Sequence, residues 1–204
     1  MTPSSDVAFT PIVKSIQSER GSREYYAKVE ARGGFRTEVT EDLTELLSKV
    51  NTAYLATSNS VGQPYAQHRG GPKGFIRMID DKTLAFADFV GNYQYVTIGN
   101  LAENPKAFLF LMDYANRRRI KIWGRAWISQ DPVLVASLTP KDYRARVEQA
   151  ILFEIEAWDI NCKQHIPRLL DATEVEVIVN ELSLRIAELE EQNASLRALI
   201  AQKG

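Results

Sequence analysis

The segment between Asn51 and Ile128 constrains the fold more than any other part of the sequence, because its apolar and polar residues alternate in short runs. Alternation over a few residues, bounded by turn-forming residues, is typical of half-buried β-strands. The runs are AYLATS, PYAQHR, FIRMI, TLAFAD, AFLFLMD and RIKIWGRAWI, and one short helical stretch at 95–105 interrupts them. Closely spaced strands with a single small helix favour an antiparallel barrel over a parallel sheet, which needs long crossovers.

Helical patterns flank this segment on both sides. Residues 10–30 form a charged segment that we expect to be helical, and ARGGF (31–35) breaks it. Thr40 is predicted to cap a short helix with leucines on one face. Later in the chain, DPVLVASL and TPKDYRARVEQA each begin with a cap residue followed by a proline, which predicts two helices, and ILFEIEAW (151–158) is a candidate last strand.

Together these patterns predict a mainly β fold with flanking helices (α+β). The expected parts are an N-terminal helical arm (1–50), a barrel domain (51–170) and a C-terminal helix (171–204). One domain with two appendages fits a length of 204 residues, and 45% hydrophobic with 25% charged residues is the composition of an ordinary globular protein.

The C-terminal segment repeats apolar residues every seven positions. One series is Val175, Leu182, Leu189 and Leu196, and a second is Val179, Ile186, Asn193 and Ile200. Leucine at d, β-branched residues at a and one asparagine at a are typical of a parallel two-stranded coiled coil, in which the asparagine fixes the register. Arg185 at a g position would face Glu190 of the partner helix. A single amphipathic helix packed on its own domain is the alternative, but the asparagine favours the coiled coil and hence a homodimer.

Charge and cysteine content bear on the class of protein. The net charge of −1 gives no overall basic field that would hold nucleic acid or an anionic membrane. The single cysteine, Cys162, excludes an internal disulfide and a four-cysteine zinc site, and it fits a reducing compartment. The N-terminus lacks a signal-peptide pattern, and no apolar run approaches the ~20 residues that cross a bilayer. We therefore expect a cytoplasmic protein without a nucleic-acid or membrane partner, and we assign no metal site.

The stretch QHRGGPKGF (67–75) sets a histidine beside an arginine and three glycines. It lacks the GxxxxGK[ST] spacing of a phosphate-binding loop. In an extended strand Gln67 and Arg69 share one face and His68 lies on the other, while Gly70 allows close approach to the backbone. Taken alone, these residues favour a plain hairpin over an anion site.

A second candidate is the run RRRIKIWGR (117–125). In a strand, Arg119, Lys121, Trp123 and Arg125 project from one face. A row of like charges repels itself, so an anion on that face is the simplest remedy, and the planar fork of arginine suits phosphate. On these residues alone, phosphate binding and an ordinary solvated strand are equally open.

A third candidate, DFVGNYQYVTIGNLAENP (88–105), places a Gly-Asn turn before the short helix. Free backbone N–H groups at the helix start and the side chains of Asn92, Gln94 and Thr97 could gather around a ligand. Gly-Asn is also ordinary turn chemistry, so this pattern alone is weak.

The three stretches in this order resemble the pyridoxamine 5′-phosphate oxidase-like, FMN-binding split-barrel flavoproteins. The resemblance covers about residues 40–130 and depends on HRGGPKGF, on GN…NLAENP, and on the basic strand that ends in GRA (124–126). It implies a six-stranded split β-barrel, usually dimeric, that binds FMN non-covalently at the subunit interface.

Carried over onto this sequence, the resemblance implies three groups of cofactor-binding residues. The first strand would contribute Gln67, His68, Arg69 and Gly70, with Arg69 at the phosphate or ribityl chain. The second segment would contribute Asn92, Gln94, Thr97 and Asn100, and the basic strand Arg119 and Lys121. The pyridoxamine phosphate oxidases proper carry Ser-Arg-Lys near Tyr95, which this chain lacks, so its second segment offers only neutral hydrogen bonds.

The segment WDINCKQHI (158–166) brings a tryptophan, the cysteine and a histidine together. A nucleophilic pair of Cys162 and His165 would need a third, orienting group that the sequence does not reveal. A core tryptophan beside a buried cysteine is the simpler interpretation. The resemblance offers another, in which the segment borders the flavin pocket and Trp158 and His165 lie on the substrate side.

The resemblance implies two functions. The first is an FMN-dependent oxidoreductase of unknown substrate, with no catalytic residue assigned and with NADH or NADPH as the candidate donor. The alternative is a non-catalytic flavin-nucleotide-binding protein that acts as a carrier, store or sensor. A third hypothesis keeps the barrel but replaces FMN with haem or a deazaflavin.

Overall fold

The computed structural model of the 204-residue chain describes residues 2–161 and 164–202. The chain forms two compact units. One unit extends to Asp113 and resumes from Arg117 to Ile166, and the other contains Tyr114–Asn116 and the chain from Pro167 onward. The strands belong to the first unit, and the second is built around one long helix.

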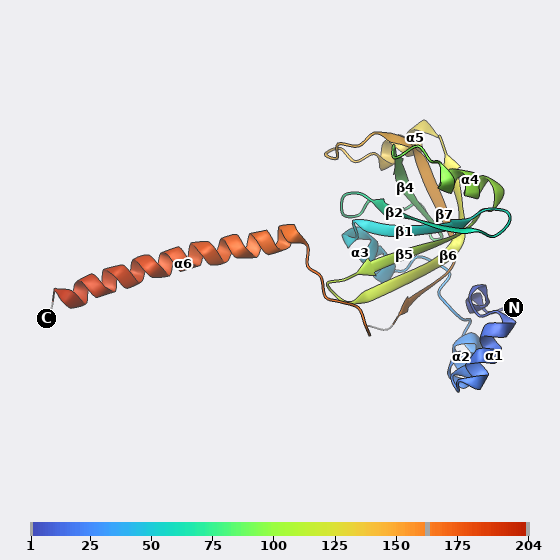
Figure 1. Cartoon of the computed structure of the whole chain (residues 1–204), viewed down its shortest axis with the longest axis horizontal. Coiled ribbons are helices and arrows are strands. Elements are labelled where there is room, and N and C mark those ends of the chain that lie inside the picture. Colours follow the sequence, from blue (N-terminus) through green and yellow to red (C-terminus); the bar gives the residue numbers. More distant parts are fainter. Residues whose placement is uncertain (1, 162–163, 203–204) are drawn as a thin grey trace. The chain divides into compact units, whose positions relative to one another are not determined.

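Within the described residues, seven antiparallel strands form one sheet in the order β2-β1-β5-β6-β7-β4-β3. Figure 1 labels these strands except β3. They are β1 (Thr52–Ser58), β2 (Pro64–Gly70), β3 (Arg77–Met78), β4 (Thr83–Phe89), β5 (Lys106–Asp113), β6 (Arg118–Ser129) and β7 (Val147–Asn161). The predicted mainly β fold with flanking helices is therefore confirmed. Because β3 contains only two residues, the other six strands make up the body of the barrel.

Side chains bring the two ends of the strand order together. Arg69 on β2 binds Asp88 on β4 at 2.5 Å. Thr97 on α4 (Val96–Glu103) donates a hydrogen bond to Gln67 on β2 at 2.8 Å. Among the described residues no backbone ladder joins β2 to β4, so the sheet curls into a barrel that is split at this seam.

Apolar side chains from alternate strand positions fill the barrel. Fully buried members of this core include Leu55, Phe86, Leu109, Ile122 and Phe153. The helix α3 (Glu41–Lys49) adds Leu43, Leu46 and Leu47 to the same core. Thr40 caps α3 as predicted, because its hydroxyl accepts a hydrogen bond from the backbone N–H of Leu43.

Gly124 lets β6 and β7 pass very close to each other. The register between these strands shifts between Trp123 and Gly124, which is the mark of a β-bulge. A Cβ atom on Gly124 would lie 1.9 Å from the carbonyl oxygen of Glu154. A larger residue would force the strands apart, so this glycine of the basic run has a structural role.

One of the two helices predicted beyond residue 130 is confirmed and the other is wrong. The helix α5 (Pro132–Leu138) begins after its predicted cap, Asp131. The helix predicted over TPKDYRARVEQA does not form, because residues 140–146 are turn and irregular structure and β7 begins at Val147. The first part of β7 pairs with β4, and this cross-strand pairing overrides a helical pattern that is only a weak local preference.

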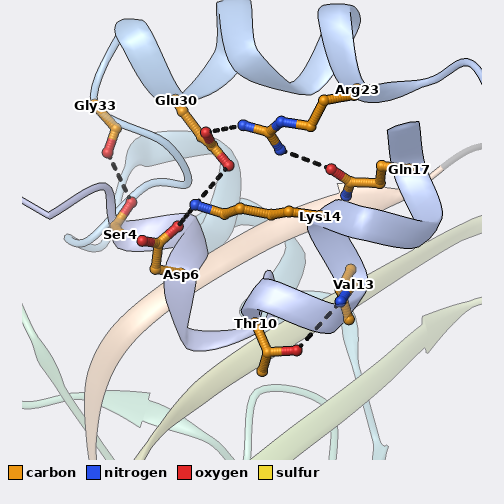
Figure 2. Close-up of polar contacts among 9 residues, drawn as sticks. All are labelled: Ser4, Asp6, Thr10, Val13, Lys14, Gln17, Arg23, Glu30 and Gly33. Carbon is orange, nitrogen blue, oxygen red and sulfur yellow. Dashed lines mark hydrogen bonds and ion pairs between the residues drawn. The ribbon is translucent and has the colours of Figure 1, made fainter. Parts of the chain in front are cut away.

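The N-terminal arm is a pair of helices held together by charged side chains (Figure 2). Its elements are η1 (Ser4–Val7), α1 (Pro11–Glu19) and α2 (Arg23–Ala31). Glu30 on α2 binds Arg23 and, at 3.2 Å, Lys14 on α1, and Lys14 also binds Asp6 of η1 at 2.6 Å. The Glu30 side chain is only 11% exposed, so this network is partly shielded from solvent.

The ARGGF break connects the arm to the barrel. Gly34 has a left-handed φ of +94°, and a Cβ atom there would lie 2.7 Å from the backbone nitrogen of Ser5. The hydroxyl of Ser4 donates to the carbonyl oxygen of Phe35 at 2.5 Å. Only glycine allows η1 to lie this close to the connection.

The second unit is dominated by α6 (Ala172–Ala201), a single helix of 30 residues. Asp171 caps it, because its carboxylate accepts a hydrogen bond from the backbone N–H of Thr173 at 3.0 Å. Every residue of α6 is exposed, including the predicted a and d positions. The predicted coiled coil needs a second helix, so it stays a prediction. Within residues 2–161 and 164–202 no helix is long and apolar enough to cross a membrane.

Candidate functional site

The strand β2 separates its polar residues between two faces. Gln67 and Arg69 are partly buried and point toward the seam, whereas His68 is exposed. The Nε2 atom of His68 lies 2.6 Å from the hydroxyl of Thr52, and its ring packs edge-on against Tyr54. His68 therefore lies on the face opposite to the polar residues of the seam.

Arg69 is the centre of the seam. Its Nη1 atom donates to Asp88 at 2.5 Å and its Nη2 atom donates to Gln67 at 3.0 Å. The other carboxylate oxygen of Asp88 accepts a hydrogen bond from Gln149 at 2.9 Å. The Nε atom of Arg69 is buried and has no hydrogen-bond partner among the described residues. A buried donor without a partner is costly, so this atom is prepared to receive an acceptor from a ligand.

The Gly-Asn segment meets β2 at this seam. The hydroxyl of Thr97 donates to Gln67, and the side chain of Asn92 accepts a hydrogen bond from the backbone of Gln94 at 3.2 Å. Tyr93 and Tyr95 both have left-handed backbones, with φ of 59° and 54°. Residues other than glycine rarely adopt this backbone conformation, and those that do are concentrated at functional sites.

Asn100 and Gly70 are not among the residues that line the small pocket between β2, β4 and the start of α4. Asn100 is buried and donates to the hydroxyl of Thr57 at 3.0 Å, so it braces α4 against β1. A Cβ atom on Gly70 would lie 2.9 Å from the ring of His68. Both residues therefore support the structure around the site, and neither is among the residues that line the pocket.

A small pocket of about 40 Å³ opens between β2, β4 and the start of α4. Its wall consists of Gln67, Arg69, Asp88, Phe89, Gly91, Asn92, Tyr93, Tyr95, Thr97, Ile98 and Glu148. The structure thus brings together the first and second of the predicted stretches. Arg119 and Lys121 of the third stretch are not among the described lining residues.

The charge balance of this seam pocket disfavours a phosphate. Asp88 neutralises the positive charge of Arg69 in an ion pair. Glu148 adds a second carboxylate to the pocket, and it accepts a hydrogen bond from the hydroxyl of Tyr95 at 3.3 Å. Desolvation, with the nearby Glu148 carboxylate, raises the pKa of Tyr95 above its ordinary value, so its hydroxyl stays a donor. The pocket fits neutral hydroxyl or N–H groups better than a doubly charged anion.

The basic strand carries its cations on a different part of the barrel. Lys121 lies 3.7 Å from Asp159 on β7 and 5.1 Å from the ring of Trp123. Desolvation lowers the pKa of Lys121, and the carboxylate of Asp159 opposes this shift. Arg119 pairs across the sheet with Met112 and Asn161. Asp159 is within ion-pair distance of Lys121, and Arg119 adds a second positive charge that is close enough to lower the pKa of Lys121.

Phe35 of the N-terminal arm covers part of this row, which the sequence did not predict. The ring of Phe35 stacks on Trp123 at 5.4 Å between ring centres, with 10° between the planes. The ammonium of Lys121 also lies 5.9 Å from the Phe35 ring. The signal that could have been used is the aromatic residue directly after the Gly-Gly break.

Trp158 and His165, the predicted substrate-side residues, occupy different environments. Trp158 is fully buried, its indole N–H donates to the carbonyl oxygen of Glu38 at 2.7 Å, and the Arg36 guanidinium lies 4.6 Å above its ring. His165 is exposed in a turn, with a left-handed φ of 58°. Cys162 lies outside the described residues, so its relation to His165 is not described. Among the residues that the structure does describe, no group of three or more His, Cys, Asp or Glu could hold a metal ion.

Comparison with known proteins places these features in a family. The family model described as pyridoxamine 5′-phosphate oxidase matches residues 39–177, which is more than half of the chain. A search of curated proteins finds no match.

Solved structures share the fold at low sequence identity. HupZ from Group A Streptococcus is 17% identical with a TM-score of 0.50, over 65% of this chain and 99% of that chain. An FMN-binding protein from Syntrophomonas wolfei is 15% identical with a TM-score of 0.46, over 76% of this chain and 99% of that chain. An F420 reductase is 20% identical with a TM-score of 0.44, over 62% of this chain and 100% of that chain. At these identities the likeness concerns the fold.

Proposed function

Because the chain belongs to the pyridoxamine 5′-phosphate oxidase family, we propose that it binds FMN and acts as an FMN-dependent oxidoreductase. The observation that carries the proposal is Arg69, which lines the pocket where the first two family stretches meet and whose buried Nε atom has no hydrogen-bond partner among the described residues. A ligand oxygen that reached this atom would give it the hydrogen-bond acceptor that it lacks.

The charges suggest how the parts of FMN are distributed. Arg69, Gln67 and Thr97 would hold neutral groups, such as ribityl hydroxyls, because Asp88 and Glu148 repel a phosphate at the seam. Arg119 and Lys121 would hold the phosphate, since Asp159 offsets only part of their charge. We therefore propose that Arg69 contacts the ribityl chain and not the phosphate.

A second copy of the chain would complete the site. A pocket of about 40 Å³ is far smaller than the roughly 300–1,000 Å³ of sites that bury a ligand of this size. We infer a homodimer in which the seam pocket of one chain faces residues of the other, and in which the α6 helices pair as a parallel coiled coil.

When bound, FMN would supply the electron or hydride transfer, with NADH or NADPH as the candidate donor. The chain's own residues would bind and orient it. Arg69 and Thr97 would fix its polar chain, and the rings of Tyr93 and Tyr95 would limit the access of water to the pocket. The hydroxyl of Tyr95, whose pKa is raised, keeps its proton and shares it in a hydrogen bond with Glu148.

One observation favours the alternative of a non-catalytic flavin carrier, store or sensor. Both carboxylates of the seam pocket are already engaged, Asp88 by Arg69 and Gln149, and Glu148 by Tyr95. Neither is placed as a free general base. Anaerobic mixing of the flavin-loaded chain with NADPH separates the two functions, because bleaching at a catalytic rate is expected only of a reductase.

The first test is the absorption spectrum of the purified full chain, followed by titration with FMN. Bands at about 370 and 450 nm are expected for bound flavin. A deazaflavin or haem gives a different spectrum, and a colourless chain that takes up no added FMN contradicts the proposal.

The second test addresses the residues. Arg119→Gln is expected to weaken FMN binding by about 1.5–3 kcal/mol, the range for hydrogen bonds to charged groups. Arg125→Gln, an exposed position further along the same strand, is the matched control. For the seam, the double variant R69Q/D88N removes both charges together, which avoids leaving a buried carboxylate unpaired. Unchanged FMN affinity in Arg119→Gln and in the double variant would refute the assignment.

A further inference from the structure

A second cavity, which shares no lining residue with the seam pocket, lies between the N-terminal arm and the barrel. It has a volume of about 420 Å³. Its wall consists of Tyr25, Tyr26 and Val29 from α2, Gly34, Phe35 and Arg36 from the connection, and Trp158, Asp159 and Ile160 from β7. The volume is within the range of sites for small organic ligands.

Aromatic rings form much of this arm cavity and are held from behind. Phe35 is stacked on Trp123 and also meets Phe9 edge-on at 5.2 Å, and Phe9 meets Tyr26 at 5.0 Å. Tyr25 remains 67% exposed although it is a large aromatic residue. Such rings, braced before a ligand arrives, favour a planar aromatic ligand that packs against them at little entropic cost.

The backbone also fixes the cavity. Arg36 and Trp158 exchange two backbone hydrogen bonds, at 3.2 and 2.8 Å, which join the connection to β7. On the opposite wall, the ion pair of Glu30 with Lys14 and the hydrogen bond from Arg23 to Gln17 hold α2 against α1 (Figure 2). The two walls are therefore positioned independently of any ligand.

The charges of the arm cavity favour an anion. Asp159 is already engaged by Lys121 at 3.7 Å. The Arg36 side chain is 50% exposed, and its carboxylate contact, Asp42, lies at 4.0 Å, the outer limit of an ion pair. A guanidinium held this loosely over an aromatic wall is suited to the carboxylate, sulfonate or phosphate of a ring compound.

We propose that the cavity between α2 and β7 is a binding site for a planar aromatic anion, with Arg36 as the anion contact and Tyr25, Tyr26 and Phe35 as the ring contacts. Its position beside Lys121 has a consequence that rests on the proposed function. If the basic strand holds FMN, a ligand in this cavity would lie next to the cofactor. The substrates of the protein would then belong to this class of planar aromatic anions.

The test uses two fluorescent probes that differ in one charged group. 8-Anilinonaphthalene-1-sulfonate carries a sulfonate, and N-phenyl-1-naphthylamine has the same rings without it. Both are titrated against the full chain and against variants. The expected result is saturable binding of the sulfonate probe, at about one per chain, with the uncharged probe bound about fivefold more weakly because it makes no ion pair with a half-exposed arginine.

Two variants separate the ring contacts from the charge contact. Arg36→Gln is expected to weaken the sulfonate probe about fivefold and to leave the uncharged probe unchanged. Tyr25→Ala is expected to weaken both probes by a similar factor of about five to ten, because it removes a ring contact. Arg32→Gln and Ile12→Ala, which are exposed on the same arm, are the matched controls and should change neither affinity.

The outcomes decide the proposal. If Tyr25→Ala leaves both probes unaffected, or if Leu184→Ala on α6 reduces the signal instead, the probes bind elsewhere and the cavity is not the site. Equal loss of both probes in Arg36→Gln contradicts the anion contact. If FMN displaces the sulfonate probe and Tyr25→Ala weakens FMN itself, the cavity is part of the flavin site and the separate site is overturned. Failure of FMN to bind at all, with the probe results as expected, removes the proposed function but leaves the arm cavity site intact.

Discussion

The barrel and α6 contain the same kinds of apolar residues but bury them very differently. Leu109 in the barrel is completely buried, whereas Leu189 and Leu182 on α6 are 42% and 58% exposed. The strands of a curled sheet place their alternate side chains inside a core that one chain can fill. A single helix has no such partner within its own unit, and we propose that a second α6 helix buries its apolar stripe.

The two regions therefore differ in what their stability depends on. Burial in the barrel is intramolecular, so its contribution to the free energy of unfolding should not change with protein concentration. Burial of the a and d residues of α6 is proposed to be intermolecular, so it should grow with concentration by mass action. This difference can be measured with matched substitutions in the two regions.

The largest effect is expected in the barrel. Phe153→Ala removes a fully buried ring from the core and should lower the free energy of unfolding by about 3–5 kcal/mol. Chemical denaturation, followed at two protein concentrations, measures it. The loss should be the same at both, and a loss that shrinks as the chain is concentrated would mean that the barrel core depends on assembly.

A smaller, concentration-dependent effect is expected on α6. Leu189→Ala at a d position should weaken dimerisation by about 2–4 kcal/mol, because it removes two leucine side chains from the a/d interface of the coiled coil. Leu184→Ala at an f position, 68% exposed, is the control and should have almost no effect. Analytical ultracentrifugation together with helix melting measures both. Equal effects of the two variants would show that the a and d residues do not form a helix–helix interface.

The barrel could be predicted from the sequence because its signals are local and repeated. Alternating runs gave the strands, and Thr40 and Asp131 gave the starts of α3 and α5. The helix expected after Thr139 was wrong, because the partner of Val147 lies on β4, far away in the sequence. Pairing between distant segments decides such cases, and a single sequence does not display it.

The seam pocket was predicted only in part, for a similar reason. The alternation on β2 correctly separated Gln67 and Arg69 from His68. The alternation did not predict that Asp88 would form an ion pair with Arg69, because the two residues meet only when the sheet curls. The sequence did not predict the arm cavity at all, because its walls come from segments more than 100 residues apart.

The N-terminal arm is intermediate between the barrel and α6 in what its stability depends on, and lowering the pH should show this. The hydrogen bond from Arg23, helped by Lys14 and opposed by desolvation, lowers the pKa of Glu30 below its ordinary value. Because the folded pKa is the lower one, the stabilisation is complete above the ordinary glutamate pKa and is lost as the pH falls through the folded pKa. The arm should then loosen below about pH 4 while the barrel, whose core is apolar, stays folded.

Hydrogen exchange of residues 11–31, corrected for intrinsic rates, measures this loosening. Glu30→Gln should raise exchange in the arm already at neutral pH and should remove most of its acid dependence. Glu24→Gln is the matched control on the same helix, because Glu24 is 85% exposed and only pairs with Lys28 one turn away, a contact of small value. If both variants exchange alike, or if the barrel opens together with the arm, then Glu30 does not hold α2, and the walls of the arm cavity are fixed by the aromatic contacts alone.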